Sequence, residues 1–153
     1  MRRTTSSADQ RLAMSAWVKL ARAANAVGGR LARGLAEYDL TESQFGVLDA
    51  LHHLGPLHQS DLARKILRTT GNVTLVVDNL ERRGLVQRER GGADRRYVRV
   101  SLTSVGEALI RQVFPQHADN VATQLAVLST DEHRQLTRLC RRLALGPGSD
   151  TER

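Results

Sequence analysis

The sequence predicts a mainly α-helical chain that carries one small β-hairpin. Apolar residues recur at steps of three and four along most of the 153 residues, which is the period of a helix that buries one face. Capping-box motifs begin at Thr41 and at Ser129, and each marks the start of a helix. Only residues 85–102 change to the alternating pattern of strands, so we expect a single hairpin among the helices.

The first two expected helices cover residues 8–38 and 42–54. In the second, Thr41 is placed to accept an amide hydrogen bond that Gln44 returns, and Gly55-Pro56 ends the helix. The apolar stripe of the first helix consists of Ala13, Trp17, Leu20, Ala24, Val27, Leu31 and Leu35.

Two shorter helices with a tight turn between them follow, which is typical of a helix-turn-helix. We expect Ser60 to cap a helix that ends near Leu67. Thr69 or Thr70 then caps a second helix that ends at Gly84. The core face of this second helix is expected to be Val73, Val76, Val77 and Leu80.

The hairpin and two further helices complete the chain. Residues 85–88 and 97–102 alternate as strands, with a Gly-Gly-Ala-Asp turn at 91–94. Thr103 or Ser104 caps a helix in which we expect a bend at Pro115, and Ser129 caps the last helix. This order describes a winged helix-turn-helix with helical extensions at both ends.

Charge and composition narrow the function classes. The chain has 23 Lys and Arg against 16 Asp and Glu, a formal charge of +7, which favours a polyanionic partner such as nucleic acid. No apolar run approaches the roughly 20 residues of a membrane span, and the N-terminus lacks an apolar signal core. We therefore expect a cytoplasmic protein that does not enter a membrane.

Motifs of the common enzyme classes are absent from the sequence. There is no G-x-S-x-G, no paired-histidine motif and no glycine-rich phosphate loop. The five histidines show no tight i, i+4 pairing with acids or thiols, so no metal site is predicted. We expect no enzymatic activity and no cofactor.

Three linked motifs resemble the signature of the MarR family of winged helix-turn-helix transcriptional regulators. They are GNVTLVVDNLERRGLV at residues 71–86, Asp94-Arg95-Arg96, and LTSVG at residues 102–106. The similarity covers about residues 40–109, and the flanking helices agree in placement. It implies a homodimeric regulator that binds a pseudo-palindromic operator in double-stranded DNA, as a repressor released by a small aromatic or phenolic effector.

The expected division of the chain follows from this resemblance. The whole of residues 1–153 forms one domain, with the winged helix-turn-helix at 41–103 as its DNA-binding lobe. Residues 8–38 and 104–145 form the dimerisation helices, because their apolar stripes are longer than one winged helix can cover. The resemblance implies that these terminal helices intertwine and place two recognition helices in successive major grooves.

The leading end of the second helix of the helix-turn-helix is the first expected DNA contact. Small and polar residues there let the backbone approach the major groove. Asn72 is placed to pair with adenine, Thr74 to meet a thymine methyl group, and Arg68 to reach a phosphate or a guanine. The expected contacts are Arg68, Thr69, Thr70, Gly71, Asn72 and Thr74.

The hairpin is the second expected DNA contact. Residues 82–99 carry seven arginines, Arg90 among them, against Glu89 and Asp94, a net charge of about +5. The resemblance implies that Arg96 enters the minor groove while Asp94 holds its guanidinium, and we expect Arg95 to contact phosphate. The alternative is an exposed, salt-bridged turn that contributes little.

Candidate sites for an effector or for redox sensing are the last feature that the sequence offers. The resemblance implies an effector pocket between the dimerisation helices and the winged helix, for which the candidates are Trp17, Tyr38, Phe45, His52 and His53. Packing residues and exposed histidines are the alternative interpretation. Cys140 is a candidate redox sensor, although its place among Leu136, Leu139 and Leu143 favours simple packing.

The main rival function is an architectural DNA-binding protein that reads shape and charge and responds to no ligand. A regulator prefers one inverted repeat over bulk DNA, and an architectural protein does not.

Overall fold

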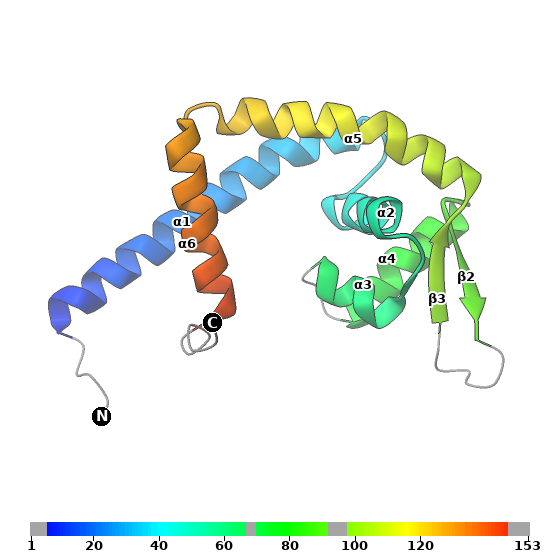
Figure 1. Cartoon of the computed structure of the whole chain (residues 1–153), viewed down its shortest axis with the longest axis horizontal. Helices are drawn as coiled ribbons and strands as arrows, with labels where there is room; N and C mark the ends of the chain where they lie inside the picture. Colours follow the sequence, from blue (N-terminus) through cyan, green and yellow to red (C-terminus); the bar gives the residue numbers. More distant parts are fainter. Residues whose placement is uncertain (1–5, 67–69, 92–97, 147–153) are drawn as a thin grey trace. The chain divides into compact units, whose positions relative to one another are not determined.

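The computed structural model describes residues 6–66, 70–91 and 98–146, with Thr70, Gly71 and Arg90 described by their backbone alone (Figure 1). These residues form two compact units, 1–120 and 121–153, whose boundary falls inside a helix. The elements run in the order α1 (Ser7–Ala36), α2 (Glu42–Leu54), β1 (Leu57–His58), α3 (Gln59–Lys65), α4 (Thr70–Arg82), β2 (Val86–Arg90), β3 (Val98–Leu102), α5 (Ser104–Leu125) and α6 (Thr130–Leu145).

The first two helices begin at capping boxes. Ser6 accepts a hydrogen bond from the amide of Asp9 at the start of α1, which the sequence analysis did not predict. Thr41 accepts from the amide of Gln44 at 3.2 Å, and the Gln44 side chain accepts from the Thr41 amide at 2.9 Å, as predicted. Only Leu35 of the thirty residues of α1 is buried within one chain.

The helix-turn-helix consists of α3 and α4. The predicted cap at Ser60 is wrong, because α3 begins two residues earlier than such a cap implies and its N-cap, His58, makes no side-chain capping bond. Gln59 thereby becomes the first helical residue, and its side chain is free to reach α4. The helix α4 ends at Arg82, and Gly84 follows with φ 69°, a left-handed conformation that glycine adopts without strain.

A three-stranded antiparallel sheet in the order β1-β3-β2 forms the wing base (Figure 1). The predicted hairpin is confirmed, with Val86 opposite Leu102 and Arg90 opposite Val98. The strand β1, which pairs Leu57 with Val100, was not predicted. Two residues are too few to display an alternating pattern, so nothing in the sequence distinguished them from a loop.

The core of the first unit lies among α2, α3, α4 and the sheet. Its largest fully buried side chains include Leu48, Leu62, Val73, Val77 and Leu80, and α5 adds Ile110 and Val113. Among the predicted core residues of α4, Val76 is only partly buried. The core therefore fixes one face of α4 and leaves the other face to solvent.

The start of α5 packs directly against the chain that enters the wing. Thr103 accepts a hydrogen bond from the Gly106 amide, which confirms it as the cap of α5, and donates one to the Gly84 carbonyl at 2.6 Å. A Cβ on Gly106 would lie 1.9 Å from the Leu85 carbonyl oxygen. Only glycine permits this approach of helix to wing. Further along, α5 continues through Pro115 as one helix.

The second unit contains the end of α5 and the whole of α6. The predicted capping box is confirmed, since Ser129 accepts from the amide of Glu132. No residue of α6 is buried within one chain, although Leu136, Leu139 and Leu143 follow one another at helical spacing. None of the helices in the described part of the chain combines the length and apolar character that a membrane span needs.

Candidate nucleic-acid interface and neighbouring cavities

The helix α4 has a buried face and an exposed face, as a recognition helix requires. Val73, Val77 and Leu80 have no exposed surface. Asn72, in the first turn, is exposed and lies on the solvent side. A helix held in this way can offer its outer face to a groove while the core fixes its orientation.

The predicted DNA contacts fall partly outside the described residues. Arg68 and Thr69 lie in the 67–69 gap, and Asp94, Arg95 and Arg96 lie in the 92–97 gap, so their contacts remain predictions. Thr70 and Gly71 form the first turn of α4, and Arg90 is the last residue of β2, two residues beyond the predicted end of that strand.

Two glutamines attach α4 to the helices behind it. Gln59 of α3 donates from Nε2 to the Thr74 hydroxyl at 2.7 Å. Gln44 of α2, buried at 9% exposure, donates from Nε2 to Asn79 Oδ1 at 2.8 Å. Thr74, which is expected to meet a thymine methyl group, therefore has its hydroxyl bonded within the protein, and its contact with DNA stays a prediction.

Arg88 connects the wing to the recognition helix. Its guanidinium lies 2.6 Å from Asp78 Oδ1 and 2.7 Å from Glu81 Oε2, both on α4. It also donates from Nε to Gln59 Oε1 at 3.2 Å and from Nη2 to the Thr74 carbonyl at 3.4 Å. The Arg88 side chain is only 18% exposed. One arginine thus holds β2, α3 and α4 together.

Arg83 has a similar internal role at the end of α4. It donates to the Asp39 carbonyl at 2.7 Å, in the turn between α1 and α2, where Asp39 itself has a positive φ of 53°. The predicted wing charge of about +5 counted Arg83 and Arg88 as available to DNA. The structure instead neutralises Arg88 with two α4 carboxylates that lie outside the counted segment.

Aromatic and histidine side chains gather where α2 faces α5. The ring of His117 stacks on Phe45 with centroids 4.2 Å apart, and that of His53 lies 5.0 Å from Phe114. Burial lowers the pKa of His117 below its ordinary value, although Asp49 and Glu42 oppose the shift. Burial of this ring therefore favours its neutral form.

A polar bridge lies beside this cluster. His52 Nδ1 of α2 lies 3.1 Å from Glu107 of α5, and Arg111 donates to the same carboxylate at 2.8 Å. The hydrogen bond from His52, followed by that from Arg111, lowers the pKa of Glu107. His52 therefore joins α2 to the helix that leaves the wing.

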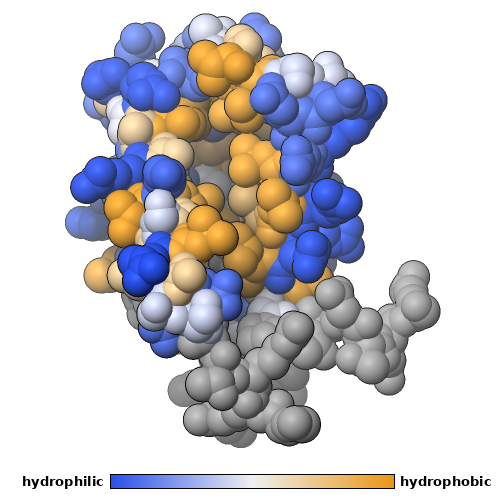
Figure 2. Space-filling view, turned by 90° about the vertical axis from the view of Figure 1, so that its left-hand side faces the viewer, coloured by the Kyte–Doolittle hydropathy of each residue, from blue (hydrophilic) through white to orange (hydrophobic). Residues whose placement is uncertain are grey.

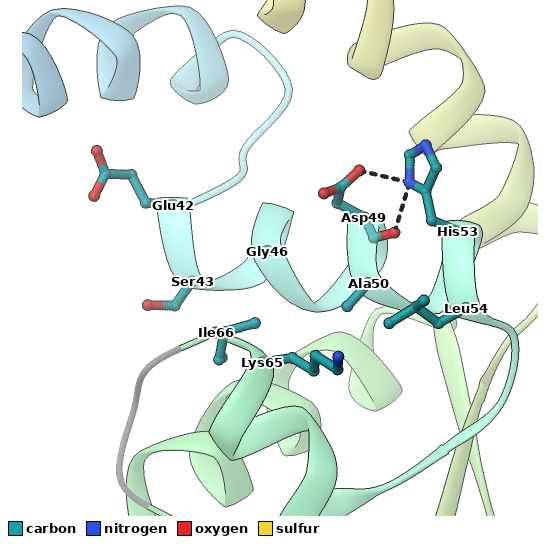
Figure 3. Close-up of a pocket in the computed structure, with 9 residues that line it drawn as sticks. All are labelled: Glu42, Ser43, Gly46, Asp49, Ala50, His53, Leu54, Lys65 and Ile66. Carbon is teal, nitrogen blue, oxygen red and sulfur yellow. Dashed lines mark hydrogen bonds and ion pairs between the residues drawn. The ribbon is translucent and has the colours of Figure 1, made fainter. Parts of the chain in front are cut away.

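A cavity of about 500 Å³ opens between α2 and the end of α3 (Figure 3). Lys65 and Ile66 form the α3 side, directly before the 67–69 segment that leads into α4. Ser43, Ala50 and Leu54 extend from α2 toward them (Figure 3). His53 also lines the cavity, and its Nδ1 lies 3.0 Å from Asp49 Oδ1.

The five predicted pocket residues lie in different places in the described part of one chain. Of the five, only His53 lines the cavity between α2 and α3, and Tyr38 lines a separate cavity of about 200 Å³ with Gln116 and His117. Phe45 and His52 face α5. Trp17 lies on α1 roughly 30 Å from Tyr38, at 1.5 Å per residue, with 63% of its surface exposed.

The structure adds little support for a metal site or for a redox role of Cys140. Asp49 and His53 form the i, i+4 acid–histidine pair that the sequence analysis overlooked, yet the described residues contain no group of three or more metal-ligating side chains. Cys140 is a free thiol, half-buried on the apolar side of α6. Its predicted neighbours Leu136, Leu139 and Leu143 are themselves exposed within one chain.

Comparisons with known proteins agree with this geometry. The MarR family model matches residues 40–98, which span the helix-turn-helix and most of the hairpin. The HTH-type transcriptional regulator MhqR of Bacillus subtilis is 30% identical over 129 residues, which are 84% of this chain and 89% of MhqR.

Two solved structures share the fold over nearly the whole chain. AbsC, a MarR family transcriptional regulator from Streptomyces coelicolor, has a TM-score of 0.79 at 23% identity, covering 94% of this chain and 96% of AbsC. Bordetella bronchiseptica BpsR, whose DNA binding is regulated by 6-hydroxynicotinic acid, has a TM-score of 0.80 at 26% identity, covering 85% of this chain and 98% of BpsR.

Proposed function

The chain belongs to the MarR family of DNA-binding transcriptional regulators, and we propose that it binds one inverted-repeat operator as a homodimer and represses transcription until a small aromatic effector releases it. The observation that carries this proposal is the attachment of the wing to the recognition helix. Arg88 ties β2 to α4 through Asp78 and Glu81, so the base of the wing and the recognition helix are held together. Such an arrangement is suited to read a major groove and its neighbouring minor groove together.

Dimerisation through the terminal helices is supported by their exposed apolar side chains. On α1, Leu12 is 72% exposed and Met14 62% exposed, and α6 has no buried residue. Hydrophobic side chains are prominent on the face that Figure 2 shows. A second copy of the chain is the economical cover for such surfaces, and its two-fold symmetry would match an inverted repeat.

The cavity between α2 and α3 is the effector site that we favour. Its volume lies within the range of small-molecule pockets, and Ala50, Leu54 and Ile66 offer apolar contacts to a ring. Among the described residues that line it, Lys65 is the only lysine or arginine and would attract an anionic substituent, while Glu42 and Asp49 add two carboxylates to the same lining. BpsR, which responds to an aromatic acid, gives this ligand class a precedent. A ligand here would contact the end of α3 at Lys65 and Ile66, and through α3 it could alter operator binding.

DNA fragments bound by the purified protein can be selected from its own genome and footprinted. We expect one protected inverted repeat, with two major-groove contacts about one helical turn apart. Asn72→Ala should relax the base preference at one position in each half-site, because a bidentate base contact is worth about 1–3 kcal/mol. Protection spread evenly along all fragments would favour the architectural alternative.

The wing contact has a separate signature in the same assay. Arg96→Ala should weaken binding to many sequences and lower the slope of log affinity against log salt by about one per subunit, since it removes a charge that displaces counterions. Asp94→Ala should have the same effect more mildly. Parental affinity of Arg96→Ala at every salt concentration would exclude the wing as a DNA contact.

The effector proposal is tested by filling the cavity. Ala50→Leu adds apolar volume without changing any charge, so the variant should bind the operator normally and lose its release by aromatic acids. Release by 6-hydroxynicotinic acid and by a panel of benzoates can be followed as loss of operator-bound fluorescence anisotropy. Undiminished release of Ala50→Leu by an active compound would place the effector elsewhere.

A further inference from the structure

Leu75 is a leucine exposed on the outer face of the recognition helix. It is 69% exposed, whereas Val73 and Val77, two positions away on either side, are fully buried. At about 100° per residue, Leu75 points roughly 200° away from both, which is the side opposite the core. It follows the exposed Asn72 by three positions, so the two side chains share one face of α4.

Leu75 differs from the other exposed apolar residues in its position. Those on α1 and α6 belong to the surfaces that we assign to dimerisation. Outside α1 and α6, Leu54 lines the α2–α3 cavity, Val105 lies at the start of α5, and Val127 lies between α5 and α6. Leu75 alone among the described exposed large hydrophobic residues lies on the helix that is to enter a groove.

Several polar side chains around Leu75 are already bound within the protein. Thr74 is bonded to Gln59, and Asn79 to Gln44. Asp78 is paired with Arg88. These contacts fix the angle at which α4 presents its outer face. They also leave Leu75 as a prominent feature of that face, although it can form no hydrogen bond to a base.

The major groove offers such a side chain one matching partner. Each A·T pair displays the C5-methyl group of thymine there, whereas a G·C pair carries no methyl group at that edge. A leucine that enters the groove gains by covering that methyl group and loses by covering the polar edge of a G·C pair.

We propose that Leu75 is a specificity-determining residue that reads a thymine methyl group in each operator half-site. This inference rests on the proposed function, since it requires α4 to enter the major groove. It adds a base preference to that function and assigns it to a residue that the sequence analysis left without a role.

Substitution of deoxyuridine for thymine tests this contact, because it removes the methyl group and retains base pairing. In the footprinted operator, each thymine is replaced in turn and affinity is measured by titration at fixed salt. The parent protein should lose about fourfold in affinity at one or two positions per half-site, the amount expected for one buried methyl-sized group. Leu75→Ala should bind thymine and deoxyuridine equally at those positions.

Two further variants make the result specific. Leu75→Met retains an apolar contact and should keep most of the thymine preference. Val105→Ala removes apolar surface of similar exposure, 60%, from a place away from the recognition helix and should reproduce the parental profile. Because both side chains are exposed, circular dichroism should confirm that all variants fold.

Two results would overturn the assignment while leaving the proposed function intact. In the first, the parent protein binds the operator specifically but loses no affinity at any deoxyuridine substitution. In the second, Leu75→Ala loses as much affinity on deoxyuridine substitution as the parent does. Absence of any preferred operator would overturn the proposed function and this assignment with it.

Discussion

Replacement of Arg88 by Met should loosen the wing without removing a DNA contact. The substitution keeps the aliphatic stem but deletes two ion pairs to Asp78 and Glu81 and the hydrogen bonds to Gln59 and the Thr74 carbonyl. Asp78 and Glu81 are nearly half exposed, so water can solvate the carboxylates that are left. We expect a loss of about 1–3 kcal/mol in the free energy of unfolding, and a Tm lower by about 5 °C.

The salt dependence of operator binding separates positioning from direct contact. Since the Arg88 guanidinium is bound within the protein, Arg88→Met should weaken operator affinity while the slope of log affinity against log salt stays parental. Arg99→Met, which removes an exposed arginine from the neighbouring strand, is the matched control and should change stability by less than about 0.5 kcal/mol. A slope lowered by about one per subunit, with unchanged stability, would identify Arg88 as a phosphate contact and refute this reasoning.

Three further predictions concern packing and titration. Gly106→Ala should lower the free energy of unfolding, measured by chemical denaturation, by about 3 kcal/mol, because the added Cβ would meet the Leu85 carbonyl oxygen. Parental stability of the variant would mean that the start of α5 can shift freely. Burial lowers the pKa of His117, so the unfolded chain binds this proton at a higher pH than the folded chain, and the free energy of unfolding should fall as the pH drops below about 6.5. His117→Phe, whose ring can still pack against Phe45, should flatten that decline between pH 7 and 5. An identical pH profile for the variant would contradict the burial of His117. Cys140→Ser should leave operator binding and its response to peroxide unchanged in a gel-shift assay, whereas loss of a peroxide response on substitution would establish the redox alternative.

Local signals in the sequence predicted most of the fold. The capping boxes at Thr41 and Ser129 located two helix starts because such motifs depend only on residues three positions apart. The hairpin was found from its alternation and turn. The strand β1 was missed because its pairing with β3 is made some forty residues away along the chain, and Ser60 was misassigned because α3 starts without any side-chain cap.

Residue types alone did not predict the contacts that side chains of the candidate interface make within the protein. Arg88 looked like one wing arginine among seven, since its partners Asp78 and Glu81 lie on another element and a charge count treats every arginine as solvated. Leu75 drew no attention within a valine-rich helix, although its phase relative to Val73 and Val77 would have placed it outward. Trp17 and Tyr38 were grouped as aromatic residues, whereas the length of α1 separates them.

The central claim is that this chain recognises one operator sequence through two contacts, the recognition helix and the wing. A competition titration measures it most directly: labelled operator is displaced from the purified protein by unlabelled operator and by sheared genomic DNA, at physiological salt. We predict that the operator competes at least about 10³-fold better than bulk DNA. Equal competition by the two DNAs would contradict the claim and leave a protein that reads only charge and shape.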